Sequence, residues 1–454
     1  MTIISDFLTE KFGESGILVT ALILFGLTYV GMIALPKIRA HIAVGGAVLF
    51  ILSGILPLNF DLLGVVNWNV LFMLAGTMGT VALFIESRMP AKMADAIIDK
   101  SPNVKWAVVL LSVFAGVISA FVDNVATLLM VAPVAMGICK KLKLNPVPVI
   151  ISIAIASNLE GAATLVGDTT SILLAGHLNM TFADFFVYTP PGQEKAGIGL
   201  FFLVQIAFIC ATLFLLWVFR KEKKPIHLEE KATVTDYVPT VLLLGTILGL
   251  IIASFLPETI GAFHKPDMIN GYICIGFYIV GLVWYKVFKR DTDIITRTLK
   301  EIDLFTLSLL AGLFLVVGGL TQSGAVDKIA EFFASVSGGN VFVIYTILVW
   351  FSVLISAVVD NIPYVATMLP VVAGIAATLG VPPTILYFGL ISGATLGGNI
   401  TPIGASTNIA ATGILRKAGH EVKTFDYMRL SVPYTLIAVA VGYVLTWVCW
   451  KYTL

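Results

Sequence analysis

Residues 119–124 read SAFVDN and residues 356–361 read SAVVDN, and each hexapeptide lies inside a long apolar run. These copies open two longer segments, residues 119–176 and 356–413, which align without a gap when Asp123 is placed on Asp360. The shared positions set backbone shape or carry charge: Ala120, Asp123, Asn124, Pro133, Gly137, Pro146, Gly161, Thr164, Gly167 and Gly176 all recur. A duplicated apolar segment with a central acid and nearby Gly and Pro is typical of a transporter's binding site.

The composition predicts an integral membrane protein, and we expect its location to be a bacterial-type plasma membrane. Of the 454 residues, 58% are hydrophobic and 12% are charged, whereas soluble domains carry about 25% charged residues. The net charge is +1 and no basic stripe with interleaved aromatics occurs, so a nucleic-acid partner is not expected. The four cysteines lie in apolar stretches and are interpreted as core residues, not as a disulfide framework or a metal set. We expect the lipid bilayer and a small ion or solute as partners, and no resident cofactor.

Apolar runs of spanning length predict an all-α polytopic protein with ten transmembrane helices. They lie near residues 16–34, 41–57, 68–86, 147–176, 197–219, 238–255, 269–287, 303–320, 383–413 and 431–450. Two further runs, residues 106–139 and 343–379, contain the Asp-Asn pairs. Each half of these runs has roughly 15 residues where a span needs about 20. We therefore predict two re-entrant helical hairpins with Asp-Asn at their tips near mid-membrane, the alternative being pairs of short, tilted spans.

The distribution of basic residues orients these spans. With Lys37 and Arg39 in the cytoplasm, all 28 Lys and Arg residues face inward except Lys11, Lys195, Lys265, Lys328 and Lys451, as the positive-inside rule favours. Both termini are then extracytoplasmic, and the polar linker at residues 220–237 is cytoplasmic. The first repeat, residues 1–219, and the second, residues 238–454, each contain five spans. Because five is odd, the second repeat enters the membrane upside down, which predicts an inverted-topology repeat.

A broken helix is predicted in each repeat, at residues 147–176 and 383–413. Glycines, a proline and clustered hydroxyls interrupt both apolar runs, and unwound backbone inside a membrane must be buried in protein or line a wet cavity. The half-helix after each break presents a positive N-terminus, which suits an anion. The freed carbonyls of residues 161–167 and 398–404 suit a cation. The alternative is close helix packing through small residues.

The hairpin aspartates, Asp123 and Asp360, predict bound positive ions. A carboxylate near the bilayer centre costs roughly 2.5–3.5 kcal/mol, and no Lys or Arg lies in any apolar run to pair with it. A proton or a hard cation such as Na⁺ remains, with Asn124 and Asn361 adding neutral amide oxygens as Na⁺ ligands. Helix capping is the structural alternative, but Asn or Ser would cap equally well without a charge.

The two repeats are not identical, because Glu160 and Asp168 correspond to Gly397 and Ala405. The first repeat is the more acidic, and two nearby acids raise the pKa of one of them, so Glu160 and Asp168 are the predicted titrating pair. No catalytic residue is expected. The candidate ion- and solute-binding residues are Asp123, Asn124, Thr127, Asn158, Glu160, Gly161, Thr164, Asp168, Thr169, Thr170, Asp360, Asn361, Asn399, Thr401, Ser406, Thr407 and Asn408.

These motifs resemble the ArsB/NhaD permease family of the ion transporter superfamily. The resemblance is carried by SNLEGAATLVGD at residues 157–168, by GGNITPIGASTN at residues 397–408, and by TFADF and TFDY at residues 181–185 and 424–427. It implies a homodimer with a scaffold domain and an elevator-like transport domain. Related sodium-coupled carboxylate transporters have Ser-Asn-Thr at the hairpin tips, where this chain has Asp-Asn. Many family members have Gly where this chain has Glu160.

The sequence thus predicts a secondary active transporter coupled to Na⁺ or H⁺ that moves a small anion such as a carboxylate or oxyanion. The alternative is a Na⁺/H⁺ antiporter, because buried acids without a base favour cations. A channel fits less well, since inverted repeats with broken helices suit alternating access. An enzyme is not expected: His420-Glu421 lacks the second His of a zinc-protease motif, and no phosphate-binding Gly-rich loop occurs.

Overall fold

The computed structural model describes residues 3–59, 61–226, 232–257, 259–260 and 263–453, with the side chains of residues 3–14, 260, 263 and 453 left out. In this part of the chain the fold is helical apart from two short antiparallel ribbons. Nine of its helices are long and apolar enough to cross a membrane, or ten if one sharply bent pair counts as a single span. The prediction of an all-α polytopic membrane protein is confirmed.

In the described part of residues 1–219, the predicted first repeat, there are ten α-helices. They are α1 (Ile3–Ala34), α2 (Arg39–Leu52), α3 (Asp61–Val65), α4 (Trp68–Glu86), α5 (Met89–Asp99), α6 (Val104–Ser119), α7 (Asn124–Leu142), α8 (Pro146–Gly161), α9 (Thr169–Leu178) and α10 (Leu200–Val218). The short elements are η1 (Pro36–Ile38), η2 (Ala183–Phe185), β1 (Val187–Tyr188) and β2 (Gly197–Ile198).

The described part of residues 238–454, the predicted second repeat, also has ten α-helices. They are α11 (Val238–Phe255), α12 (Ile269–Phe288), α13 (Ile294–Glu301), α14 (Leu304–Gln322), α15 (Ala325–Val336), α16 (Val341–Ser356), α17 (Asn361–Leu379), α18 (Thr384–Gly397), α19 (Ser406–Lys417) and α20 (Thr424–Trp450). The short elements are β3 (Thr259–Ile260), β4 (Phe263–His264), η3 (Gly398–Ile400) and η4 (Lys451–Thr453).

Some helices differ in length from the predicted spans. The second hairpin arms, α7 and α17, have 19 residues each, and the first arms, α6 and α16, have 16. By length, α7 and α17 can therefore cross a membrane, and the choice between re-entrant hairpins and tilted spans stays open. The span predicted at residues 41–57 is wrong at its end, because α2 stops at Leu52 and the chain turns through Gly54 with a positive φ of 76°.

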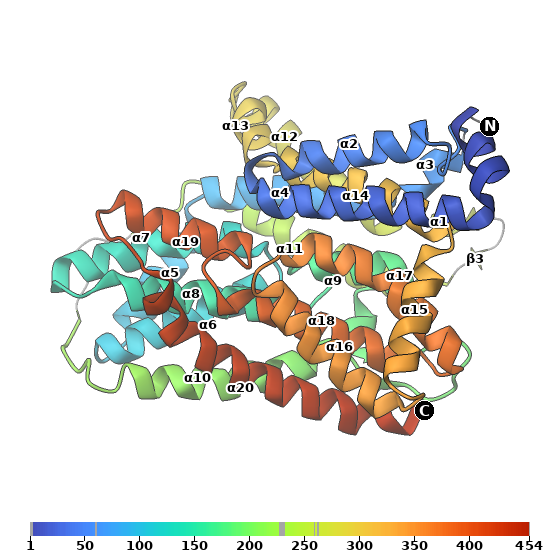
Figure 1. Cartoon of the computed structure of the whole chain (residues 1–454). Helices are drawn as coiled ribbons and strands as arrows, with labels where there is room; N and C mark the ends of the chain where they lie inside the picture. Colours follow the sequence, from blue (N-terminus) through green and yellow to red (C-terminus); the bar gives the residue numbers. More distant parts are fainter. Residues whose placement is uncertain (1–2, 60, 227–231, 258, 261–262, 454) are drawn as a thin grey trace.

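The helices form layers (Figure 1). One side carries α1, α2, α4 and α14, the opposite side carries α10 and α20, and the hairpins and broken helices lie between them. Contacts support this arrangement: α2 packs on α14, α4 on α12, and α10 on α20. Helices α14 and α17 touch across the layers, as do α4 and α9. We call α1, α2, α4, α12 and α14 the outer layer.

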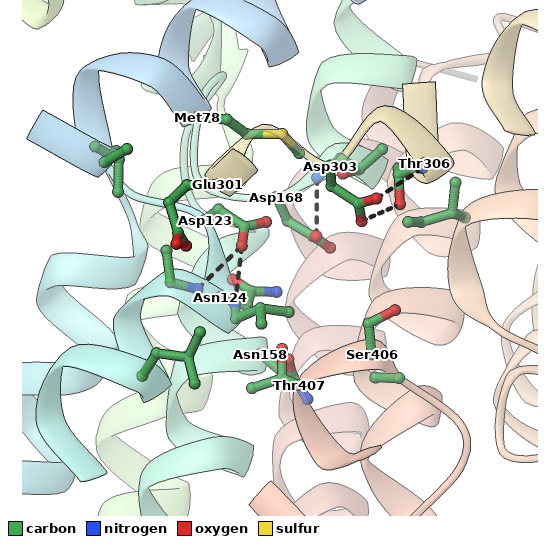
Figure 2. A pocket seen from close by; sticks show the side chains of 18 of the residues that line it. Met78, Asp123, Asn124, Asn158, Asp168, Glu301, Asp303, Thr306, Ser406 and Thr407 are labelled. Carbon is green, nitrogen blue, oxygen red and sulfur yellow. Dashed lines mark hydrogen bonds between the residues drawn. The ribbon is translucent and has the colours of Figure 1, made fainter. Parts of the chain in front are cut away.

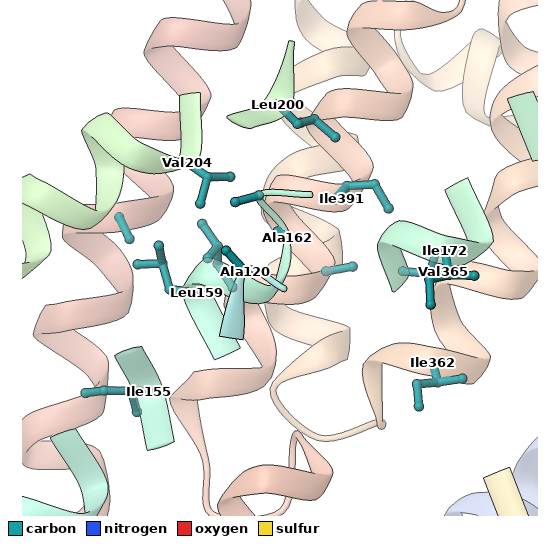
Figure 3. Close-up of a cluster of buried hydrophobic side chains, with 14 of the residues drawn as sticks. Ala120, Ile155, Leu159, Ala162, Ile172, Leu200, Val204, Ile362, Val365 and Ile391 are labelled. Carbon is teal, nitrogen blue, oxygen red and sulfur yellow. The ribbon is translucent and has the colours of Figure 1, made fainter. Parts of the chain in front are cut away.

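Buried aliphatic side chains join the hairpins to the helix breaks (Figure 3). Ala120 at the first hairpin tip lies beside Leu159 and Ala162 at the end of α8. Val365 of α17 lies beside Ile172 of α9, and all five side chains are buried. Because lipid tails are as apolar as these side chains, close fit and not water exclusion stabilises such packing. The second hairpin is therefore fitted against the broken helix of the first repeat.

Candidate functional site

Each hairpin tip is a helix start capped by its aspartate. The Asp123 Oδ1 accepts hydrogen bonds from the backbone N–H groups of Val125 at 3.0 Å and Ala126 at 3.2 Å. In the second copy, the Asp360 Oδ1 accepts from the N–H of Ile362 at 3.1 Å. Capping is thus part of the role of both residues. It uses only Oδ1, and the Asp123 Oδ2 has no hydrogen-bond partner among the described residues.

The helix breaks repeat the same backbone contacts. A Cβ on Gly167 would lie 2.5 Å from the carbonyl oxygen of Gly161, and a Cβ on Gly404 would lie 2.6 Å from that of Gly398. Only glycine therefore allows the unwound chain to fold back this closely onto the preceding helix. Beside these glycines, the Thr164 hydroxyl donates to the Ala120 carbonyl and the Thr401 hydroxyl donates to the Ala357 carbonyl. The two threonines tie each break to its hairpin tip.

Thr164→Val and Thr401→Val are expected to lower the thermal unfolding temperature by similar amounts. Each change leaves a buried hairpin carbonyl without its donor, which costs about 1–3 kcal/mol. The control is Thr378→Val, whose exposed hydroxyl bonds to Gly374 within α17 and whose loss should cost below about 0.5 kcal/mol. Unfolding temperatures equal to wild type in both variants would show that the hydroxyls do not hold the tips.

A cavity of about 140 Å³ lies where the first hairpin meets the starts of α9, α14, α17 and α19 (Figure 2). This space would hold roughly five water molecules, at about 30 Å³ each. Its polar lining consists of Asp123, Asn124, Asn158, Asp168, Thr169, Glu301, Asp303, Thr306, Asn361, Ser406 and Thr407. Residues from both repeats and from the outer layer therefore face one chamber.

Four carboxylates line this cavity, and no Lys, Arg or His of the described chain does. Glu301 and Asp303 are exposed, Asp123 is half-buried and Asp168 is buried, so the acids lead from the surface inward. Asp303 is held by the N–H and hydroxyl of Thr306, at 3.0 Å and 2.6 Å. An acid-lined chamber with low-dielectric walls concentrates cations and repels free anions.

Asn158, one of the residues that line the cavity, carries a neutral oxygen without a hydrogen-bond donor in the described chain. Its side chain is 1% exposed, its Nδ2 donates to Asn399 Oδ1 at 2.8 Å and Asn408 Oδ1 at 2.9 Å, and its own Oδ1 has no partner among the described residues. A buried acceptor without a donor is costly. By contrast, the Asn124 Oδ1, which was predicted to be a Na⁺ ligand, accepts a hydrogen bond from the Ser119 hydroxyl at 2.7 Å. In the described chain no three His, Cys, Asp or Glu side chains converge on one point, so a cation here needs such neutral oxygens.

The expectation that neither hairpin aspartate has a basic partner is wrong for Asp360. The Arg39 Nη1 lies 2.7 Å from the Asp360 Oδ2, and the two side chains are 13% and 6% exposed. Arg39 was assigned to a short cytoplasmic loop, but it is the first residue of α2, and packing of the outer layer brings it to the second hairpin tip. Asp360 does not line the cavity. The Na⁺ role predicted for Asp360 therefore has a competing cation already in place.

Glu160 also lies outside the cavity lining. Its Oε2 accepts a hydrogen bond from Gln205 of α10 at 2.5 Å, and its Oε1 is buried without a partner among the described residues. No hydrogen bond joins Glu160 to Asp168 in the described chain. Asp168 instead accepts from the N–H of Thr169 at 2.8 Å and from the Thr170 hydroxyl at 2.7 Å. The predicted pairing of the two acids has no contact to support it.

The remaining predicted residues divide into two sets. Asn361, Ser406, Thr407 and Thr169 line the cavity. The others serve the surrounding frame: Thr127, Gly161, Thr164, Thr170, Asn399, Thr401 and Asn408 lie outside the lining. Thr170, for example, bonds to Thr395 across the repeats at 2.8 Å. Binding roles for the first set stay predictions.

Glu301 and Asp303 were missed as site residues because they lie at the edge of a predicted cytoplasmic loop. The signal was present: Asp303 precedes Thr306 at the start of an apolar run, which is a helix-cap pattern. Its equivalent in the first repeat, Asn67, caps α4 in the same way. Because the cap of α14 is an acid and the cap of α4 is an amide, Asp303 adds negative charge to the cavity and Asn67 does not.

Comparison with known proteins agrees with a transporter. The model of the CitMHS family, described as citrate transporter, matches residues 21–393. The chain belongs to the CitMHS family. Its members and neighbours are transporters and not enzymes, so the expectation of no enzymatic activity is confirmed. The match lies within the broader group of ion transporters and does not single out the ArsB/NhaD branch that the motifs resemble.

Among relatives of this CitMHS protein, an uncharacterized transporter of Mycobacterium tuberculosis is 30% identical over 391 residues, covering 84% of this chain and 86% of the relative. The P protein of Homo sapiens is 26% identical over 449 residues, covering 83% of this chain and 53% of the P protein. Among solved structures, the YdaH transporter of Alcanivorax borkumensis has a TM-score of 0.61 at 16% identity, covering 87% of this chain and 88% of that one. The latter likeness concerns the fold alone.

Proposed function

We propose that the chain is a Na⁺-coupled secondary active transporter whose coupling ion binds in the cavity lined by Asp123 and Asp168. The acidic lining without a base carries this proposal. The free Oδ2 of Asp123 and the partnerless Oδ1 of Asn158 are the ligands we assign first. Hard cations bind such carboxylate and amide oxygens.

Sodium is favoured over a proton by the Asn158 oxygen. A proton neutralises a carboxylate without further acceptors, whereas a metal cation needs several oxygens around it. A buried amide oxygen without a donor, on a residue that lines the cavity, therefore suits the binding of a metal cation better than the binding of a proton. Coupling to H⁺ remains the alternative.

For the transported solute, the family description favours a carboxylate, with citrate as the first candidate. The start of α19 supports an anion, because Ala405 provides no side-chain cap and Ser406 and Thr407 line the cavity. Helix N-termini attract anions. In an acid-lined chamber this attraction suffices only after a cation has reduced the negative charge. We therefore propose that Na⁺ binds first and that the carboxylate follows.

We further propose that the two repeats have inverted topology and that the inner helices move against the outer layer as an elevator. The contacts that recur at equivalent positions of the two repeats, such as those of Thr164 and Thr401, support a duplicated unit. The basic-residue pattern supports the inversion and places both termini outside. A homodimer is part of the same proposal.

A second candidate is Na⁺/H⁺ antiport, which the four cavity carboxylates favour because they need no anion. Proteoliposomes with an imposed Na⁺ gradient distinguish the two functions. Uptake of radiolabelled citrate that requires Na⁺ supports the symporter. A pH change on adding Na⁺ without any carboxylate supports the antiporter. If neither the uptake nor the pH change is observed, the result contradicts a Na⁺-coupled function.

Asp168→Asn is expected to weaken Na⁺ activation of transport by on the order of tenfold or more, because it removes a charged ligand. Glu160→Gln should leave Na⁺ activation within about twofold, since Glu160 faces Gln205 and not the cavity. The measurement is the Na⁺ concentration for half-maximal uptake at several pH values. A moved pH optimum in Glu160→Gln would return that residue to the proton path.

A further inference from the structure

The equivalent aspartates of the two repeats have different neighbouring side chains. Asp123 faces a cavity that it shares with Asp168 and that contains no base in the described chain. Asp360, at the equivalent position of the second repeat, is paired with Arg39. Ala405 stands where the first repeat has Asp168. One copy therefore has carboxylates without a basic side chain beside them in the described chain, and the other has one carboxylate paired with a guanidinium.

The frames around these aspartates share one capping contact. In both copies Oδ1 caps the following helix, through Val125 in the first and Ile362 in the second. Oδ2 is the atom without a partner at Asp123, and Oδ2 is the atom that Arg39 contacts at Asp360. The guanidinium thus takes the position that stays free in the first repeat.

The neighbouring hydroxyl supports the same interpretation. Ser406, the equivalent of Thr169, donates to the Asp360 Oδ2 at 3.2 Å, and the Arg39 Nη2 lies 3.4 Å from the same hydroxyl oxygen. Arg39 therefore sits between a carboxylate and a hydroxyl, which are both ligands for an alkali cation. The Cζ of Arg39 lies 5.9 Å from the Phe305 ring centroid, within the range of a cation–π contact.

The hydrogen bonding of Arg39 is incomplete, since its Nε is buried without a partner among the described residues. A guanidinium is best stabilised when its planar fork is bound bidentately, and here one nitrogen makes the close contact with the carboxylate. The Asp360 carboxylate is therefore stabilised mainly by the positive charge of Arg39, and less by the geometry of its N–H donors.

We propose that Arg39 is a tethered cation that fills the second-repeat counterpart of the Asp123 site, so that the hairpin tips bind one free Na⁺ and not two. This inference rests on the proposed function of the Asp123 cavity. Asp360 and Ser406 are the first ligands of the site that opens when the guanidinium is removed.

The test is equilibrium binding of radioactive sodium to the purified full-length protein in nanodiscs, counted per chain. Arg39→Gln should bind one Na⁺ more than wild type. Arg39→Lys should bind the same number as wild type, because an ammonium group still supplies the charge. Asp360→Asn combined with Arg39→Gln should lose the extra ion. The wild-type number tests the proposed function, and the difference between variants tests the inference.

An Arg39→Gln protein that folds and binds no additional Na⁺ would overturn the inference. If Arg39→Gln unfolds on purification in choline chloride, NaCl should restore its thermal stability. Failure of NaCl to do so, while the Arg39→Gln/Asp360→Asn protein is stable, would also overturn it, because Na⁺ would then be unable to replace the guanidinium. A wild type that binds no Na⁺ while Arg39→Gln binds one would reject only the Na⁺ site at Asp123.

Discussion

Asp123→Asn is expected to reduce Na⁺-driven transport by about 100-fold while the protein still inserts and folds. The amide oxygen of Asn can accept from the N–H groups of Val125 and Ala126, so the helix cap survives. The charge at Oδ2 is lost, and losing a charged ligand is worth up to about 3 kcal/mol, or about two orders of magnitude in affinity. Asp123→Ala should abolish transport as well and lose the cap.

The measurement is initial uptake into proteoliposomes under an imposed Na⁺ gradient. Asp184→Asn is the matched control, because Asp184, like Asp123, accepts a hydrogen bond from a backbone N–H group, that of Thr181 at 2.6 Å. Unlike Asp123, it also accepts one from a hydroxyl, that of Thr181 at 2.7 Å. It lies outside the cavity lining and should transport like wild type. A wild-type rate in Asp123→Asn would remove the residue from the ion site.

Asp360→Ala is expected to destabilise the protein by about 3 kcal/mol and to stop transport. Removing one partner of a buried ion pair leaves the other charge uncompensated, which costs about 3–5 kcal/mol, and we expect the lower end because Arg39 is 13% exposed. The pair also joins α2 of the outer layer to the second hairpin. Loss of the carboxylate therefore loosens a contact between layers.

Thermal unfolding in detergent measures this effect. Glu331→Ala, which breaks an exposed pair with Lys328 at 2.8 Å, should change stability little. Combining Asp360→Asn with Arg39→Gln should recover much of the loss, because neither residue then carries a buried charge. If Asp360→Ala unfolds at the wild-type temperature, the ion pair makes no net contribution to the fold.

Local features of the site followed from the sequence because short-range chemistry sets them. Asp123 and Asp360 precede apolar runs and cap helices, as the capping interpretation required. The glycines and hydroxyls at Gly161 and Gly398 mark the places where α8 and α18 end. Caps and breaks depend on neighbours within a few residues, so one sequence suffices to place them.

Long-range contacts could not be predicted in this way. Arg39 and Asp360 belong to different repeats and lie far apart in the sequence, and Arg39 counted only as a charge that orients the chain. Asp303 reaches the cavity because α14 packs in the outer layer, which no local pattern states.

The direction in which the Glu160 side chain points depends on its angular position around the axis of α8. Glu160 and Asn158 are two residues apart on α8, about 200° around the helix axis. They therefore point in different directions, Asn158 into the cavity and Glu160 toward Gln205. The predicted pairing of Glu160 with Asp168 took account of their nearness to the helix break and not of the directions in which their side chains point.

The location of the ion itself tests the account most directly. Crystals grown with a thallium(I) salt in place of Na⁺ would show the bound cation by its anomalous scattering. The account predicts a peak in the cavity, in contact with the carboxylate of Asp123 and the amide oxygen of Asn158, and none between Asp360 and Arg39. A cavity without a peak, in a protein whose transport depends on the same cation, would contradict it.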